Sequence, residues 1–100
     1  MQVYNISFQI APTLQGQWLP WMKQKFIPMI QATACFTDHK FYELDIAEDQ
    51  APTYTLQLFS ASPEKLTQYQ ETLSHDIMNE LLNTWGDQCF HFITTMRIVN

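Results

Sequence analysis

The stretch Trp18–Phe36, WLPWMKQKFIPMIQATACF, decides how the rest of the chain can be arranged. Its apolar residues recur at helical spacing, which predicts a helix that begins between Gln15 and Gln17. Pro28 lacks a backbone N–H and its ring clashes with the preceding turn, so the helix should end or kink at Ile27. The sequence therefore predicts two short helical pieces at an angle, followed by a turn that leads into a strand.

Segments on either side of this helix alternate with the period of two that is typical of β-strands. Val3–Ile10 is the first such segment, and Phe36–Ala47 and Thr53–Ser60 follow, joined by a polar loop over residues 48–52. One face of each strand is expected to pack against the helices. The residues expected on that face are Tyr4, Ile6, Phe8, Ile10, Tyr42, Leu44, Ile46, Tyr54, Leu56 and Leu58.

A second helix is predicted from Ser62-Pro63-Glu64 onward. A hydroxyl N-cap, a proline at the first helical position and an acid in the first turn are typical signals of a helix start. Gly86 is a suitable helix stop, and Gln88–Val99 is then the last strand. A single apolar stripe marks the buried side of this helix: Leu66, Tyr69, Leu73, Ile77 and Leu81.

The predicted order of elements is therefore βαββαβ. This order is the split βαβ, or ferredoxin-like, arrangement of the α+β class, with a four-stranded antiparallel sheet and both helices on one face. One hundred residues are expected to form a single domain, 1–100, with a modest core that oligomerisation would support.

Composition and charge exclude several classes of protein. The formal net charge is −5, so the chain lacks the basic stripe that a nucleic-acid-binding protein needs. No apolar run reaches the roughly 20 residues of a membrane span. The start of the chain does not resemble a signal peptide, so we expect a bacterial, cytoplasmic protein with both cysteines reduced. Neither the cysteines nor the histidines have metal-site spacing, and no glycine-rich phosphate loop is present, so no metal and no cofactor is predicted.

The face of the sheet that lies away from the helices is the expected location of a site. Its polar and apolar composition fits a solvated face, a wet dimer interface or a small-molecule pocket between two packed sheets. The pocket hypothesis names Asn5, Ser7, Thr55, Gln57 and His91 as ligand-binding residues. The residues expected on this open face are Asn5, Ser7, Gln9, Glu43, Thr55, Gln57, Phe59, His91, Ile93, Thr95 and Arg97.

Two tryptophans are secondary candidates for ligand contact. Trp18 and Trp21 are large aromatic side chains that could stack on a ligand. Their helical spacing makes packing in the core or in an interface the simpler interpretation. The sequence assigns no catalytic residues, which stay unknown.

Several segments together resemble an uncharacterised family of bacterial proteins of about this length. They are Trp21-Met22-Lys23, Ile27-Pro28, Ala32–Phe36, Tyr4-Asn5-Ile6, Thr53–Gln57 and Trp85-Gly86-Asp87. The family is a domain of unknown function in the dimeric α/β-barrel branch of the ferredoxin-like superfamily. The resemblance implies that fold and a homodimer.

The same superfamily includes cofactor-independent monooxygenases and haem-degrading enzymes. Haem degraders use an Asn on the first strand together with a His and a Trp on or near the second helix. Asn5 matches the first of these positions, whereas Tyr69 and His75 do not match the other two.

The main functional prediction is a non-catalytic homodimeric module that binds a small ligand or a partner protein. The alternative is a small cofactor-independent monooxygenase or haem-related enzyme. A regulatory domain of the amino-acid-sensing type, which shares the βαββαβ order, is a third possibility.

Overall fold

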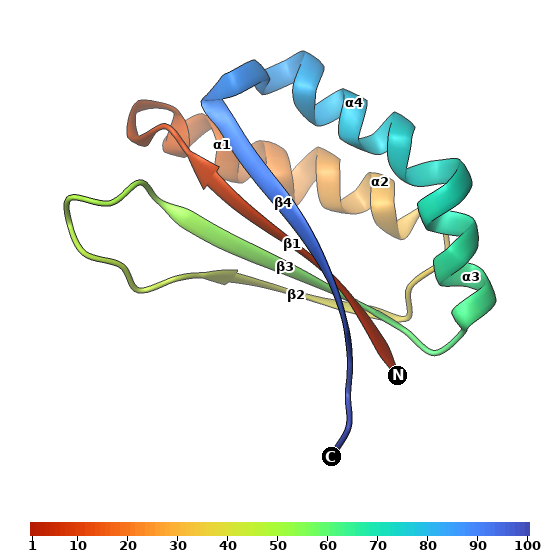
Figure 1. Ribbon diagram of the computed structural model, residues 1–100. Helices are drawn as coiled ribbons and strands as arrows, with labels where there is room; N and C mark the ends of the chain where they lie inside the picture. Colours follow the sequence, from red (N-terminus) through yellow and green to blue (C-terminus); the bar gives the residue numbers. More distant parts are fainter.

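A computed structural model describes all residues, 1–100, and contains one antiparallel sheet with two long helices on one of its faces (Figure 1). This is the predicted α+β, ferredoxin-like arrangement. The strand order across the sheet is β2-β3-β1-β4, so β2 and β4 are the edges. The strands are β1 (Gln2–Ile10), β2 (Asp38–Glu43), β3 (Thr53–Ser60) and β4 (Cys89–Arg97).

The first helical region is continuous from Gln15 to Gln31. It consists of α1 (Gln15–Trp21), a π-helical turn (Met22–Phe26) and α2 (Ile27–Gln31), after a short 3-10 turn at Pro12–Leu14. The predicted start is confirmed, but the expectation that the helix breaks into two pieces at Pro28 is wrong. The wider π-turn ends at Phe26, two residues before Pro28, and it changes the backbone hydrogen-bonding next to the proline, which has no N–H to donate.

The second helical region shows the same pattern. It consists of α3 (Pro63–Gln68), a π-helical turn (Tyr69–Leu73) and α4 (Ser74–Trp85). Ser62 caps its start, because the Ser62 hydroxyl accepts a hydrogen bond from the Lys65 amide at 3.2 Å. Gly86 ends it with φ 58°, a backbone conformation that glycine adopts without a steric penalty. Both predicted ends of this helix are confirmed.

The core lies between the helices and the sheet and is rich in aromatic rings. Trp18 from α1 is at its centre and fully buried, 5.0 Å from the ring of Tyr54 and 5.5 Å from that of Phe8. Tyr69 is equally buried near the other end of the sheet, 5.3 Å from Tyr4. These side chains come from β1, β3 and both helical regions, so the core fixes both layers relative to each other.

Strand β2 is shorter than predicted, Asp38–Glu43 in place of Phe36–Ala47. Phe36 leaves the sheet because its ring packs into the core, 4.9 Å from Tyr69. Beyond Glu43 a single backbone bond, from the Leu44 amide to the Thr53 carbonyl, continues the pairing. The loop between β2 and β3 then projects beyond the end of the sheet near α1 (Figure 1). None of the helices combines the length and the hydropathy that crossing a lipid bilayer would require.

Candidate functional site

Strand pairing brings four of the five predicted site residues together on the open face. Asn5 lies opposite Gln57, and Ser7 lies opposite Thr55, on the two central strands β1 and β3. Alternation along β1 places the Asn5 and Ser7 side chains on the other face of the sheet from Ile6 and Phe8, which are buried under the helices. The four residues therefore form a continuous polar strip, as the alternation of the two central strands predicts.

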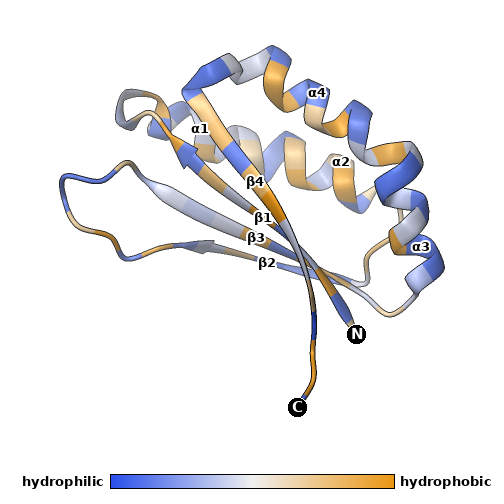
Figure 2. Cartoon of the chain, viewed as in Figure 1, coloured by the Kyte–Doolittle hydropathy of each residue, from blue (hydrophilic) through white to orange (hydrophobic).

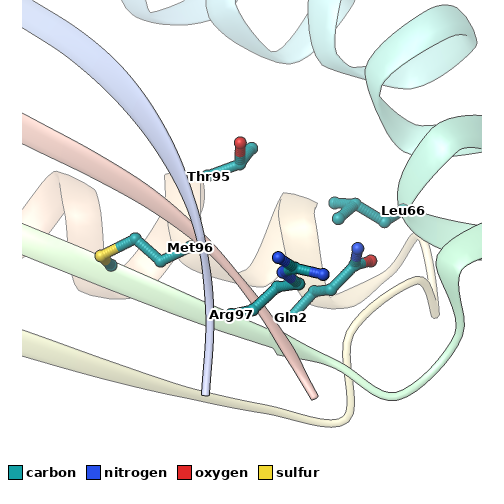
Figure 3. Close-up of a pocket in the computed structure, with 5 residues that line it drawn as sticks. All are labelled: Gln2, Leu66, Thr95, Met96 and Arg97. Carbon is teal, nitrogen blue, oxygen red and sulfur yellow. The ribbon is translucent and has the colours of Figure 1, made fainter. Parts of the chain in front are cut away.

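His91 does not belong to this strip. It pairs with Phe8, so it lies on the helix-covered face, and its predicted place on the open face is wrong. Figure 3 shows the same alternation farther along β4: Thr95 and Arg97 point toward Leu66 of α3, whereas Met96 points away. Ile93, Thr95 and Arg97 were also expected on the open face, and they too lie on the helix-covered face.

Strand β2 is reversed in the same way. Glu43 pairs with Tyr54 and Phe41 with Leu56, so both lie on the helix-covered face, although the sequence placed Glu43 on the open face. Phe41 packs 5.6 Å from the Tyr54 ring. Tyr42, expected in the core, lies opposite Thr55 and is 43% exposed on the open face.

The open face is consequently a polar strip framed by exposed apolar side chains. Phe90, Phe92 and Met96 of β4 are 61%, 53% and 39% exposed, and they pair with Gln9, Ser7 and Val3 of β1. They were missed because the residues that alternate with them, from His91 to Arg97, were expected on this face. Figure 2 shows the apolar stretches along β4. The strands contain more apolar side chains than two helices can cover, and this excess was the signal in the sequence for an exposed apolar surface.

Asn5 is the most constrained residue of the strip. It is 8% exposed, its amide nitrogen donates a hydrogen bond to the Ser7 hydroxyl at 3.4 Å, and its oxygen Oδ1 is buried without a partner. The Ser7 and Thr55 hydroxyls lie 3.4 Å apart. Groups of this kind are uncharged and orient a ligand through hydrogen bonds, and an unpartnered buried acceptor is available for a donor on that ligand.

His91 lies instead at a hollow of about 490 Å³ beside α4, with Leu82 and Cys89 among its walls. Burial lowers the pKa of the His91 imidazole, because a desolvated site disfavours its charged form. Burial also raises the pKa of the Cys89 thiol to about 11, against a smaller opposing contribution from Trp18. The thiol is therefore protonated and unreactive at neutral pH.

The two candidate tryptophans pack against other side chains. Trp18 is fully buried in the core and reaches no solvent. Trp21 is half-buried, with its ring 5.6 Å from Phe26 and 5.7 Å from Trp85. These contacts agree with the packing interpretation of both residues.

A smaller hollow of about 330 Å³ lies at the end of β1, where Gln2, Thr95 and Arg97 converge with Leu66 (Figure 3). Nowhere in the structure is a group of three or more His, Cys, Asp or Glu side chains placed to hold a metal ion.

Comparisons with known proteins agree on the fold. A crystal structure of an ethyl tert-butyl ether d (ethd) family protein from Bacillus halodurans matches with a TM-score of 0.70 and 13% identity, covering 94% of this chain and 97% of that chain. A dimeric ferredoxin-like protein from an uncultured marine organism matches with a TM-score of 0.70 and 10% identity, covering 100% of this chain and 96% of that chain. A putative antibiotic biosynthesis monooxygenase from Deinococcus radiodurans matches with a TM-score of 0.65 and 10% identity, covering 100% of this chain and 94% of that chain. Identities this low show a shared fold only.

Among curated protein sequences, none matches the chain. A family model does match, over residues 1–99, and its description is "Domain of unknown function (DUF4286)". This match covers nearly the whole chain and agrees with the resemblance seen in the sequence. The chain, whose own fold is ferredoxin-like, therefore belongs to the DUF4286 family.

Proposed function

We propose that the protein is a homodimeric, non-catalytic binding module that packs two open sheet faces together and holds a small ligand between them. The observation that carries the proposal is the composition of this face. Exposed apolar side chains of β4 frame a polar strip in which Asn5 keeps a buried, unpartnered oxygen. An apolar frame around a few oriented polar groups is typical of a small-molecule site.

The frame favours a second copy of the chain as the cover of this face. Phe90 and Phe92 lie in contact, with ring centroids 6.3 Å apart, and both are more than half exposed. Contiguous exposed apolar surface of this kind marks an interaction site. The only charged side chains on the face are Asp38 and Lys40, at the β2 edge. The dimeric solved structure with the same fold supports this assembly.

The strip indicates the chemistry of the ligand. A buried carbonyl oxygen without a partner costs about 1–3 kcal/mol, which a ligand N–H or O–H would recover. Asn5 also has an amide N–H₂, so a planar group with an adjacent donor and acceptor fits it best. Because the strip is uncharged, we expect a neutral, mainly apolar compound of the lactam or phenol type.

The dimer is tested by one charged substitution on each face of β4. Phe92→Asp places a carboxylate in the centre of the apolar frame, and we expect a monomer by light scattering at micromolar concentration, where the wild type is a dimer. Thr95→Asp is the matched control, since Thr95 is exposed on the opposite face of the same strand, and it should stay dimeric. A monomeric wild type, or equal effects of the two substitutions, would contradict the proposal.

The ligand site is tested with a neutral lactam, 2-quinolinone, as the probe. We expect saturable shifts of the Asn5 side-chain amide signals in NMR spectra, and loss of binding in Asn5→Leu. Asn5→Leu should remain a folded dimer, because it replaces an unsatisfied polar group by an apolar one of similar volume. Unchanged Asn5 signals across lactam and phenol probes, with the dimer intact, would argue for a plain interface.

The oxygenase alternative would use the same chamber. His91, expected from the sequence among the ligand-binding residues of this face, lies on the other face of the sheet, which leaves the chamber with amides and hydroxyls. We therefore expect no oxygen uptake with quinols and no spectral shift on titration with haemin. Either signal, abolished by Asn5→Leu, would favour the enzyme over the binding module.

A further inference from the structure

A second hollow, of about 620 Å³, lies on the helix side of the molecule, apart from the open sheet face. It is the space between the start of α1 and the ends of β2 and β3, close to the loop that joins these two strands. Its volume lies within the range of small-molecule sites. Pro12, Leu19 and Pro20 supply apolar wall, and Gln15, Tyr54 and Glu43 supply polar groups.

The polar wall is a connected hydrogen-bond network. The Gln15 side-chain amide donates to the Tyr54 hydroxyl, and it also lies 3.4 Å from Glu43 Oε2. The Tyr54 hydroxyl donates to the same Glu43 oxygen at 3.4 Å. Tyr54 is 3% exposed, so its ring is fixed in the core and holds the network in position. The Glu43 carboxylate is thereby oriented toward the hollow, with Oε1 free.

A positive charge lies on the other side of the same hollow. Lys23 lines it, together with the Gln24 amide. The single ion pair of the structure joins Lys25 to Glu80, so Lys23 and Glu43 are not paired with each other. The hollow thus presents one ammonium and one carboxylate, neither of them in an ion pair, at separate positions beside an apolar wall.

The helix beside the hollow, α1, has an unusual composition for a helix. Gly16 and Pro20 are poor helix formers, and each lowers the intrinsic stability of the helix. A Cβ atom at Gly16 would meet no atom within 4 Å, so the glycine leaves space open and is not required by packing. Pro20 also supplies no N–H to the Gly16 carbonyl, four residues earlier. Such local departures from stable design are expected where a site is built.

We infer that this hollow binds a zwitterionic amino acid with an apolar side chain. The ligand's ammonium group lies against Glu43 and the Tyr54 hydroxyl, its carboxylate against Lys23, and its side chain against Leu19 and the prolines. A ligand without net charge is neither attracted nor repelled by the net charge of −5. A free anion would be repelled by that charge, and an amine alone would leave Lys23 unused.

The chain contains only two glycines, which makes a selective experiment possible. Protein labelled with ¹⁵N-glycine gives one backbone amide signal from Gly16, in the hollow, and one from Gly86, which does not line it. Leucine, isoleucine, valine, methionine and phenylalanine are each titrated to about 10 mM, a range that detects millimolar affinity. We expect a saturable shift of the Gly16 signal for at least one of them and an unmoved Gly86 signal.

The analogues of that amino acid distinguish the two charges. For leucine they are isoamylamine, which lacks the carboxylate, and 4-methylpentanoate, which lacks the ammonium group. Each should bind at least about tenfold more weakly, because each loses one charged hydrogen bond. Equal binding of the amine alone would show a cation site and overturn the inference. Equal binding of the carboxylate alone would overturn it in favour of an anion site.

Variants test the assigned groups. Glu43→Gln and Lys23→Gln should each weaken binding about tenfold. Lys25→Gln is the matched control on the same helix and should keep wild-type affinity, since Lys25 does not line the hollow. Gly16→Leu should fill the hollow and abolish binding, measured by calorimetry, while Gly16→Ala checks that the helix tolerates a side chain there.

The inference is independent of the open-face proposal. It is overturned if the Gly16 signal stays unmoved by all five amino acids, or if Glu43→Gln binds as tightly as the wild type. Phe92→Asp should leave amino-acid binding intact, so failure of one site is distinguishable from failure of the other.

Discussion

His91 shows how the environment of one residue couples folding to pH. It is half-buried beside α4, and burial lowers the pKa of its imidazole below the ordinary value of 6.5. The unfolded chain therefore binds more protons than the folded one as the pH falls below that value. The free energy of unfolding then decreases with falling pH. The stability that neutral His91 contributes is lost as the pH falls through the pKa of the folded state.

We predict a lower urea midpoint at about pH 5 than at about pH 7, with a smaller difference in His91→Gln than in the wild type. The measurement is urea unfolding followed by tryptophan fluorescence. His75→Gln, a substitution of an exposed histidine on α4, should keep the wild-type difference. An identical pH dependence in His91→Gln would show that the buried imidazole does not contribute.

At the scale of elements, the start of the second helix is set by one side chain. The Ser62 hydroxyl accepts from the Lys65 amide and also donates to the Glu64 carboxylate at 3.2 Å. Ser62→Ala removes this cap, and we predict a loss of about 1 kcal/mol in the free energy of unfolding, measured with urea. Thr67→Ala, an exposed change within α3, should be neutral or slightly stabilising because alanine is the better helix former.

The elements also show what the sequence could and could not predict. The central strands β1 and β3 were placed on the correct faces because each has an apolar side under the helices and a polar side away from them. The edge strands were reversed. Phe41 and Tyr42 of β2 are both aromatic, and Phe92 and Ile93 of β4 are both apolar, so alternation alone does not identify the core face.

The same limit explains the candidate site. Asn5, Ser7, Thr55 and Gln57 lie on the central strands and were grouped correctly, whereas His91 was misplaced with its edge strand. The hollow beside α1 was missed because its residues come from three separate segments with no common spacing. The π-turns were missed as well, since a π-turn has no sequence pattern of its own beyond the nearby Pro28.

At the scale of the whole molecule, charge opposes the proposed dimer while apolar contact favours it. Two copies, each with a net charge of −5, repel one another, and the open face has no charged pair in its centre. We predict that raising NaCl from about 50 mM to about 500 mM lowers the dissociation constant of the dimer, because salt screens this repulsion. Sedimentation equilibrium measures the constant. A weaker dimer in high salt would indicate an interface held by ion pairs.

The pairing of the first strand with the last has a mechanical consequence. The Ile98 amide donates to the Met1 carbonyl at 3.1 Å, so the two chain ends leave the sheet side by side (Figure 1). A force applied to these ends pulls directly across the antiparallel ladder of β1 and β4. Its hydrogen bonds then break one pair after another, in an unzipping mode, and do not resist together as they do in shear. Under tension β4 detaches first from β1, and the sheet loses its apolar edge strand before the helices move.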